Sequence, residues 1–382
     1  MEVTGIICEY NPLHLGHKKQ LSRIRAERGE DSGIVCLMSG NYVQRGEPAI
    51  VDKMHRAEAA LRCGADLVLE LPITVSLSSA EGFAAGGVKI LSSFCDYLCF
   101  GCETDQPEQL MHIARLLLCD DYRTLLQQHL QTGISFPAAR QAALAQLGAD
   151  DSIVTAPNNI LAVEYCKAIL QQNTKMHPMP IFRPGSYHDM TPDPSAPSAT
   201  SVRSAMVCGS DYLPYIPEET RSCFAGASLH TRNAGEKAML ARLRCMEETD
   251  FEALPYGSEG LWRKLMHAVR REASVEDILQ SVKSKRYTYT RLSRMLMCAH
   301  LGITAEMLHA PAPYVRVLAF NDKGRKILNT ARQSGCFPNV GETQQHSWQA
   351  LENRCSDLYG LFTIDGAEPA GLEAKRRIVY LP

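Results

Sequence analysis

Short apolar runs alternate with helical patterns through the first half of the chain, and this alternation restricts the fold more than any other feature. The apolar runs occupy residues 3–7, 33–38, 67–71 and 96–101. Helical patterns occupy residues 17–28, 52–63 and 79–93. Continuous apolar strands are covered on both faces, and strand–helix–strand units make their strands parallel. The sequence therefore predicts an α/β fold with a Rossmann-like, doubly wound parallel sheet.

The turn after the first run carries the most informative residues, Asn11-Pro-Leu-His-Leu-Gly-His17. Proline ends the strand, so His14 and His17 open the next helix, where unpaired backbone N–H groups and the helix dipole favour phosphate. Gly16 lets a ligand approach the backbone closely. Two histidines three apart point the same way and could donate to phosphate oxygens. They could equally be ordinary surface residues, and zinc would need a third ligand, for which only Glu9 is near.

Extended upstream through Glu9 and Tyr10, this stretch resembles the HxGH signature of the nucleotidylyltransferase superfamily, relatives of class I aminoacyl-tRNA synthetases. The segment from Ser39 to Lys53 is more specific and resembles the bacterial tRNA(Met) cytidine acetate ligase family. The resemblance extends to about residue 330. It implies that His14 and His17 are catalytic. It also implies an ATP site that begins with Ile7, Cys8, Glu9, Tyr10, Asn11, Pro12, Leu13, His14, Leu15, Gly16, His17, Lys18, Lys19 and Gln20.

Three further places are expected to shape the nucleotide pocket. Gly101 ends a predicted strand, at the edge where open α/β sheets bind ligands, and its missing Cβ would admit an adenosine. Asn158 and Asn159 open a helix, where asparagine is an ordinary cap, but the resemblance implies that one of the two contacts ATP. The resemblance also implies nucleotide binding by Arg183, at the exit of a short strand near 180–184.

The segment Ser198-Ala-Thr-Ser-Val-Arg203 resembles the second signature of the superfamily, ISSTxxR, whose hydroxyls and arginine hold the ATP phosphates. Ala199 replaces a hydroxyl residue of that signature. Thr200, Ser201 and Arg203 are expected to hold the β- and γ-phosphates. A plain Ser/Thr cap of a helix is the alternative interpretation.

The second half of the chain is predicted to be mainly helical, at 237–248, 258–272 and 275–285. We expect an ATP-binding catalytic domain over 1–210 and a mainly helical tRNA-binding domain over 211–382. The segment over 283–294 interleaves cations with tyrosines. Cations bind phosphate and aromatic rings stack on unpaired bases, although a solvated helix face has the same composition. The expected tRNA-binding residues are Lys283, Lys285, Arg286, Tyr287, Tyr289, Arg291 and Arg294.

The loop over 39–53 is expected at the rim of the active site. Arg45 and Lys53 could contact triphosphate or RNA, or they could pair with local acids such as Asp52 and Glu47.

Composition limits the remaining possibilities. The formal net charge is −2, so contact with RNA must come from a local basic face. No apolar run approaches the ~18 residues of a membrane helix, and no signal peptide opens the chain, which predicts a cytoplasmic protein without membrane contact. The 14 cysteines lack disulfide-like spacing, and Cys99-Phe-Gly-Cys102 is interpreted as structural. No metal cluster is predicted; Mg²⁺ is expected to bridge the phosphates of bound ATP.

The resemblance implies a two-step reaction. Acetate attacks the α-phosphate of ATP to give acetyl-adenylate and pyrophosphate, and N4 of the wobble cytidine of elongator tRNA(Met) then takes the acetyl group, which releases AMP and forms N4-acetylcytidine. Two alternatives stay open. One is an adenylyltransferase acting on a small phosphate ester such as pantetheine phosphate or nicotinamide mononucleotide. The other is a non-catalytic RNA-binding protein with a relic pocket, for which Ala199 is the local indication.

Overall fold

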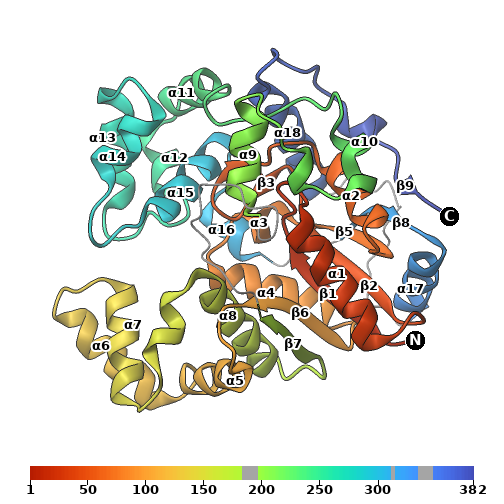
Figure 1. The fold of residues 1–382 in the computed structure, drawn as a ribbon. Coiled ribbons are helices and arrows are strands. Elements are labelled where there is room, and N and C mark those ends of the chain that lie inside the picture. The colour runs from red at the N-terminus through yellow and green to blue at the C-terminus, as the bar shows by residue number, and fades with distance from the viewer. Residues whose placement is uncertain (183–196, 311–314, 334–346) are drawn as a thin grey trace.

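A computed structural model describes residues 1–182, 197–310, 315–333 and 347–382 of the chain (Figure 1). In these ranges a main sheet has the strand order β7-β6-β1-β2-β5-β8-β9. The strands are β1 Val3–Cys8, β2 Gly33–Ser39, β5 Leu67–Leu71, β6 Tyr97–Cys102, β7 His177–Phe182, β8 Arg316–Phe320 and β9 Val379–Tyr380. All neighbours pair in parallel except β5 and β8. The predicted Rossmann-like sheet is confirmed.

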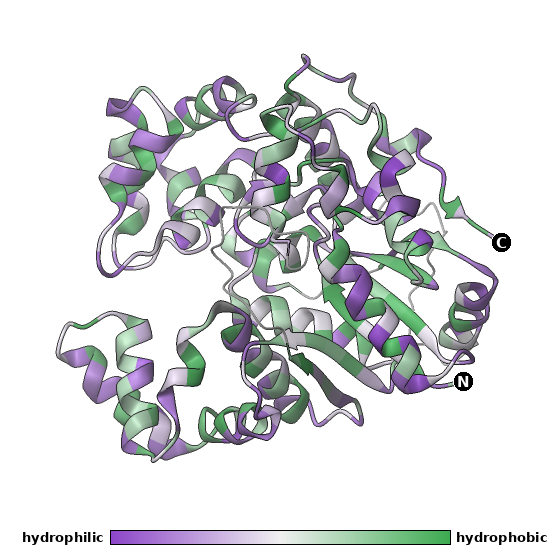
Figure 2. Ribbon diagram, viewed as in Figure 1, coloured by the Kyte–Doolittle hydropathy of each residue, from purple (hydrophilic) through white to green (hydrophobic). Residues whose placement is uncertain are grey.

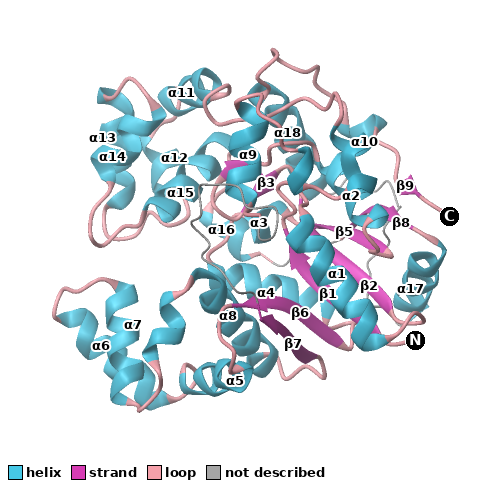
Figure 3. Cartoon of the chain, viewed as in Figure 1, coloured by secondary structure: helices cyan, strands magenta, loops and turns pink. Residues whose placement is uncertain are grey.

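Helices cover both faces of this sheet (Figure 3). One face carries α1 Leu15–Arg28, α2 Lys53–Arg62, α9 Ala199–Val207 and α10 Arg221–Phe224. The other face carries α4 Ala80–Leu91, α5 Pro107–Leu116, α8 Pro157–Gln171 and α17 Asp322–Gln333. The helical hairpin α6 Asp120–Gln131 and α7 Phe136–Gln146 follows α5. The fold is therefore doubly wound, as predicted.

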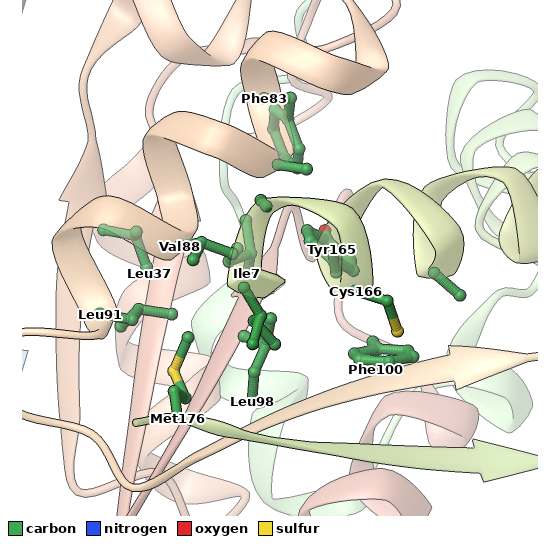
Figure 4. Packing of buried hydrophobic residues seen from close by; sticks show 14 of the residues in the cluster. Ile7, Leu37, Phe83, Val88, Leu91, Leu98, Phe100, Tyr165, Cys166 and Met176 are labelled. Carbon is green, nitrogen blue, oxygen red and sulfur yellow. The ribbon is translucent and has the colours of Figure 1, made fainter. Parts of the chain in front are cut away.

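The apolar runs form strands because adjacent residues serve two different cores. Ile6 packs into the core on the α1 side, whereas Ile7 packs into the core on the α4 side. The strands are accordingly among the most hydrophobic segments in Figure 2. Figure 4 shows Ile7 beside Val88, Leu98 and other residues of the α4-side core. A side chain at Gly87 would collide with Ile7, so this glycine allows α4 to approach the sheet closely.

The second half of the chain is mainly helical and forms a third core of its own. Its helices are α11 Glu236–Arg244, α12 Glu248–Glu252, α13 Leu261–Arg271, α14 Val275–Val282, α15 Tyr289–Leu301, α16 Ala305–His309 and α18 Ser347–Tyr359. This core also takes in Ile73 of the short helix α3 Ile73–Ser76. Strands β8 and β9 come from the same half yet extend the main sheet, which the sequence analysis did not anticipate. The division at residue 210 stays a prediction. No helix in the described ranges is long and apolar enough to cross a membrane.

Candidate active site

The predicted signature lies where the order of the strands reverses. Strand β1 pairs with β2 on one side and with β6 on the other, and all three are parallel. The loops that leave β1 and β6 therefore start next to each other at the same edge of the sheet. Crevices at such reversals are where open α/β sheets bind ligands.

His14 and His17 are fixed to the first turn of α1 by two reciprocal hydrogen bonds. His14 is the N-cap residue, and its Nδ1 accepts from the Gly16 backbone N–H at 3.1 Å. The His14 backbone N–H donates to Nδ1 of His17 at 3.2 Å. The two rings stack with 3.8 Å between centroids. Because both Nδ1 atoms accept hydrogen bonds, the neutral rings carry their protons on Nε2 and can each donate from that atom.

Several of the predicted ATP residues upstream of His14 are buried in the protein. Tyr10 and Leu13 pack into the core on the α1 side. The side chain of Asn11 accepts from the Ile50 backbone N–H at 2.7 Å, which fastens the turn to the loop after β2. These side chains shape the turn, so any contact of theirs with a nucleotide would come from the backbone.

The second predicted signature lies against the first. Arg203, on α9, donates from Nη1 to the Asn11 carbonyl at 2.7 Å and from Nη2 to Thr200 Oγ1 at 3.1 Å. Ser198 caps α9 by accepting from the Ser201 backbone N–H at 3.0 Å. Ser201 is buried and donates its hydroxyl to the Ser198 carbonyl at 2.9 Å. The structure thus brings Thr200 and Arg203 to the turn and makes Ser198 the N-cap of α9, whereas phosphate binding by Thr200, Ser201 and Arg203 stays a prediction.

Both asparagines at the start of α8 hold the loop after β6. Asn159 is buried and accepts from the Glu103 backbone N–H at 2.7 Å. Asn158 donates to the Glu103 carboxylate at 2.6 Å. Glu103 therefore organises the loop next to Gly101, a role that the sequence analysis missed. Which asparagine contacts ATP stays open.

Arg56 is a second residue that the sequence analysis missed. Its guanidinium is fully buried and donates to the carbonyls of Glu9 at 2.7 Å, Ser39 at 3.0 Å, Val51 at 3.0 Å and Gly40. Glu9 follows β1, Ser39 and Gly40 lie at the end of β2, and Val51 precedes α2, so one side chain ties the HxGH turn to the loop over 39–53. Burial lowers the pKa of Arg56 from its usual value. The available signal was a cation among the alanines and Leu61 of the buried face of α2.

The expectation for Lys53 is wrong. Its ammonium is buried and pairs with Glu70 and Glu373 at 2.7 Å each, instead of with the nucleotide, RNA or the adjacent acids. Asp52 instead caps α2 and pairs with Arg376. No sequence pattern marks partners that lie 17 and 320 positions away.

Glu47 pairs with Arg232 at 2.7 Å, which joins the rim of the site to the helical half. Burial raises the pKa of the Glu47 carboxyl, and the cations Arg232 and Arg203 act in the opposite direction. Gly46, next to it, has φ +76 and lies so close to the backbone at Ser293 and Arg294 that a side chain would collide. The role predicted for Arg45 stays a prediction.

The expected tRNA-binding residues do not share one helix face. Helix α14 ends at Val282, residues 283–288 are not helical, and α15 begins at Tyr289. Tyr287 and Arg294 are buried, so neither presents its side chain to solvent, which corrects the expectation for these two. Tyr289 bonds to Arg232 and Glu276, and Arg291 bonds to Tyr256 and Ser258. Lys283, Lys285 and Arg286 are exposed, and Arg286 pairs with Glu259 at 2.5 Å; tRNA binding by these three stays a prediction.

The remaining predictions fall in different places. Arg183 lies outside the described residues. Lys18 pairs with Glu219, and Gln20 contacts Cys99 Sγ at 3.5 Å. The described cysteines are free thiols, and burial raises the pKa of Cys99 to about 12, which suits the predicted structural role. The described ranges contain no group of three or more His, Cys, Asp or Glu side chains placed to hold a metal ion.

Comparisons with known proteins give the family. The profile described as HIGH Nucleotidyl Transferase matches residues 1–370. The tRNA(Met) cytidine acetate ligase of Clostridium novyi is 37% identical over 100% of both chains, and that of Anoxybacillus flavithermus is 36% identical over 89% of both. The crystal structure of apo Thermotoga maritima TmcAL superimposes with a TM-score of 0.91 at 28% identity over 100% of both chains. A second structure of that protein, bound with alpha-thio ATP, gives a TM-score of 0.88. The chain belongs to the tRNA(Met) cytidine acetate ligase family of HIGH nucleotidyl transferases.

Proposed function

We propose that this protein is an ATP-dependent ligase that transfers acetate to N4 of the wobble cytidine of elongator tRNA(Met). One observation carries the proposal. The paired imidazoles of His14 and His17 lie at a helix N-terminus, at the strand-order reversal, beside Arg203. The names of the relatives and the alpha-thio ATP bound by the Thermotoga maritima protein support the choice of substrates.

In the first step, a carboxylate oxygen of acetate attacks the α-phosphorus, and the bond from that phosphorus to the bridging oxygen breaks. Negative charge grows on the α-phosphate oxygens and on the departing pyrophosphate. The Nε2–H groups of His14 and His17 are donors for this charge, and the positive end of the α1 dipole favours it. Arg203 and Thr200 would hold the pyrophosphate half. Their mutual hydrogen bond keeps the guanidinium oriented before ATP arrives.

In the second step, the exocyclic amine of cytidine attacks the acetyl carbon and the bond to AMP breaks. Adenylate is already a good leaving group, so the protein needs no serine or cysteine nucleophile. Alignment of the amine with the acyl carbon is the main requirement. The exposed cations Lys283, Lys285 and Arg286 are proposed to hold the tRNA backbone during this step.

In this proposal the only metal ion is Mg²⁺, and it enters the site bound to ATP. Mg²⁺ commonly binds through substrate phosphates and one or two carboxylates, which suits a site without a dedicated metal cluster in the described ranges. Bound in that way, it would neutralise phosphate charge. We place the enzyme in the cytoplasm, where ATP, acetate and tRNA occur together.

Acetate-dependent exchange of labelled pyrophosphate into ATP tests the first step without RNA. The wild-type protein should catalyse the exchange only when acetate is present. His14→Ala and His17→Ala should each slow it about 10²- to 10³-fold, the usual effect of removing one transition-state donor. His112→Ala replaces an exposed histidine of α5 and should change nothing. Exchange that needs a phosphate ester in place of acetate would contradict the proposal and favour a small-molecule adenylyltransferase.

A further inference from the structure

A hollow lies in the helical half, formed by elements that contribute nothing to the candidate active site. It has a volume of about 320 Å³. Its walls come from α11, the end of α15, α18 and the turn over Gly360–Phe362. The lining residues are Ala238, Arg242, His300, Leu301, Gly302, Arg354, Leu358 and Leu361. This volume falls within the range of small-molecule sites, about 300–1,000 Å³.

Two guanidinium groups converge on the hollow. A Cβ placed on Gly302 would lie 3.5 Å from a terminal nitrogen of Arg354 and 4.0 Å from one of Arg242. Arg354 uses one donor, to the Gly302 carbonyl at 3.4 Å. Across the part of the chain that the structure describes, neither arginine forms an ion pair with a carboxylate. Two like charges held together without a counter-ion favour an anion between them.

His300 gives an independent indication of a missing partner. Its imidazole lines the hollow and is only 2% exposed. Within the described residues, neither of its ring nitrogens has a hydrogen-bond partner. Its ring contacts Phe362 edge-on, which fixes its position. Buried polar groups are nearly always paired, so the imidazole in the wall of the hollow is a polar group that lacks its partner.

We propose that this hollow binds a nucleotide unit, with its phosphate between Arg242 and Arg354. Two guanidiniums match the charge and the oxygen geometry of a phosphate. Leu301, Leu358 and Leu361 supply apolar surface for a base, and the His300 ring lies beside them in the wall. The unit could belong to a free nucleotide or to the RNA chain, because both present the same group.

Equilibrium binding of AMP to the full chain tests the proposal, because the active site and the hollow should each take one equivalent. Wild-type protein should therefore bind one equivalent of AMP beyond the one in the active site. The Arg242→Ala/Arg354→Ala variant should bind it at least tenfold more weakly. Both replaced side chains are exposed, so the variant should fold normally. The control Arg123→Ala/Arg271→Ala removes the same charge at two exposed surface positions and should bind like the wild type.

The affinity for tRNA separates the two sources of the nucleotide. If the hollow takes a unit of RNA, the Arg242→Ala/Arg354→Ala variant should bind tRNA at least tenfold more weakly than the control variant. If it takes a free nucleotide, only the AMP equivalent should be lost and tRNA affinity should match the control. Ala238→Trp, which fills the hollow and keeps both charges, should reproduce whichever loss is seen. The proposal would be overturned if the wild-type protein bound no further equivalent of AMP and the variant bound tRNA as tightly as the control.

Discussion

Replacement of Arg56 by methionine should show how much the buried guanidinium contributes to the site. Methionine keeps an unbranched side chain but removes the charge and all donors. The carbonyls of Glu9, Ser39, Gly40 and Val51 then lose their partner. Removing one partner of a buried charged group typically costs about 3–5 kcal/mol. We expect Arg56→Met to lower the free energy of unfolding by about 4 kcal/mol, a large share of the roughly 5–15 kcal/mol of a typical domain.

Lysine at position 56 should have an intermediate effect. It keeps the charge, but its compact ammonium cannot reproduce the fork that reaches carbonyls on three segments. We expect Arg56→Lys to cost about 2 kcal/mol, since some carbonyls stay unpaired. Catalysis should suffer in both variants. The HxGH turn is tied to the loop over 39–53 through Arg56, and a displacement of about 1 Å can slow a reaction about 10²-fold.

Urea titration followed by circular dichroism, and the pyrophosphate exchange assay, measure the two effects. Arg62→Met on the same helix is the matched control. Arg62 is half-exposed and pairs with Glu58 at 2.7 Å, a surface contact of about 0.3–0.5 kcal/mol. If Arg56→Met lost no more stability and no more exchange activity than Arg62→Met, the argument that Arg56 holds the two loops together would be refuted.

Three further perturbations have definite expected outcomes. His17→Ala should slow acetate activation about 10²- to 10³-fold yet keep tRNA affinity, as measured by filter binding. Lys285→Glu/Arg286→Glu should do the reverse: exchange unchanged and tRNA affinity at least about tenfold lower, whereas unchanged affinity would mean that the RNA contact lies elsewhere. Burial lowers the pKa of His230 to about 4 from 6.5. Between pH 6.5 and 4 the unfolded chain therefore binds a proton that the folded chain does not. In that window the free energy of unfolding should fall on acidification by up to about 1.4 kcal/mol per pH unit. His230→Phe should reduce that slope in urea titrations, and an unchanged slope would contradict this assignment.

The parts of the fold that could be predicted from sequence are those that depend on local patterns. The runs that became β1, β2, β5 and β6 are continuous and apolar because each strand faces a core on both sides. The His14-to-His17 turn could be placed because proline ends the strand and the helical pattern follows at once. The stacked geometry of the two imidazoles follows from their spacing of three residues on one helical turn.

The parts that could not be predicted depend on partners far apart in sequence. Strand β8 pairs with β5 across more than 240 intervening positions, and nothing in its short apolar run specifies that neighbour. Lys53 was misplaced for the same reason, because its partner Glu373 comes from near the C-terminus. The basic segment over 283–294 looked uniform, but its residues differ in burial because the helix breaks at Val282 and begins again at Tyr289. Cation content alone does not reveal such a break.

The most direct test of the proposed function is the product formed from labelled acetate. Purified protein, ATP, labelled acetate and unmodified bacterial tRNA should give RNA whose nucleoside digest contains labelled N4-acetylcytidine. The product should disappear without ATP, and His14→Ala and His17→Ala should reduce it strongly while His112→Ala does not. The central claim would be contradicted if the RNA stayed unlabelled while the protein still bound tRNA. It would also be contradicted if the RNA acquired label equally well with His14 and His17 both replaced.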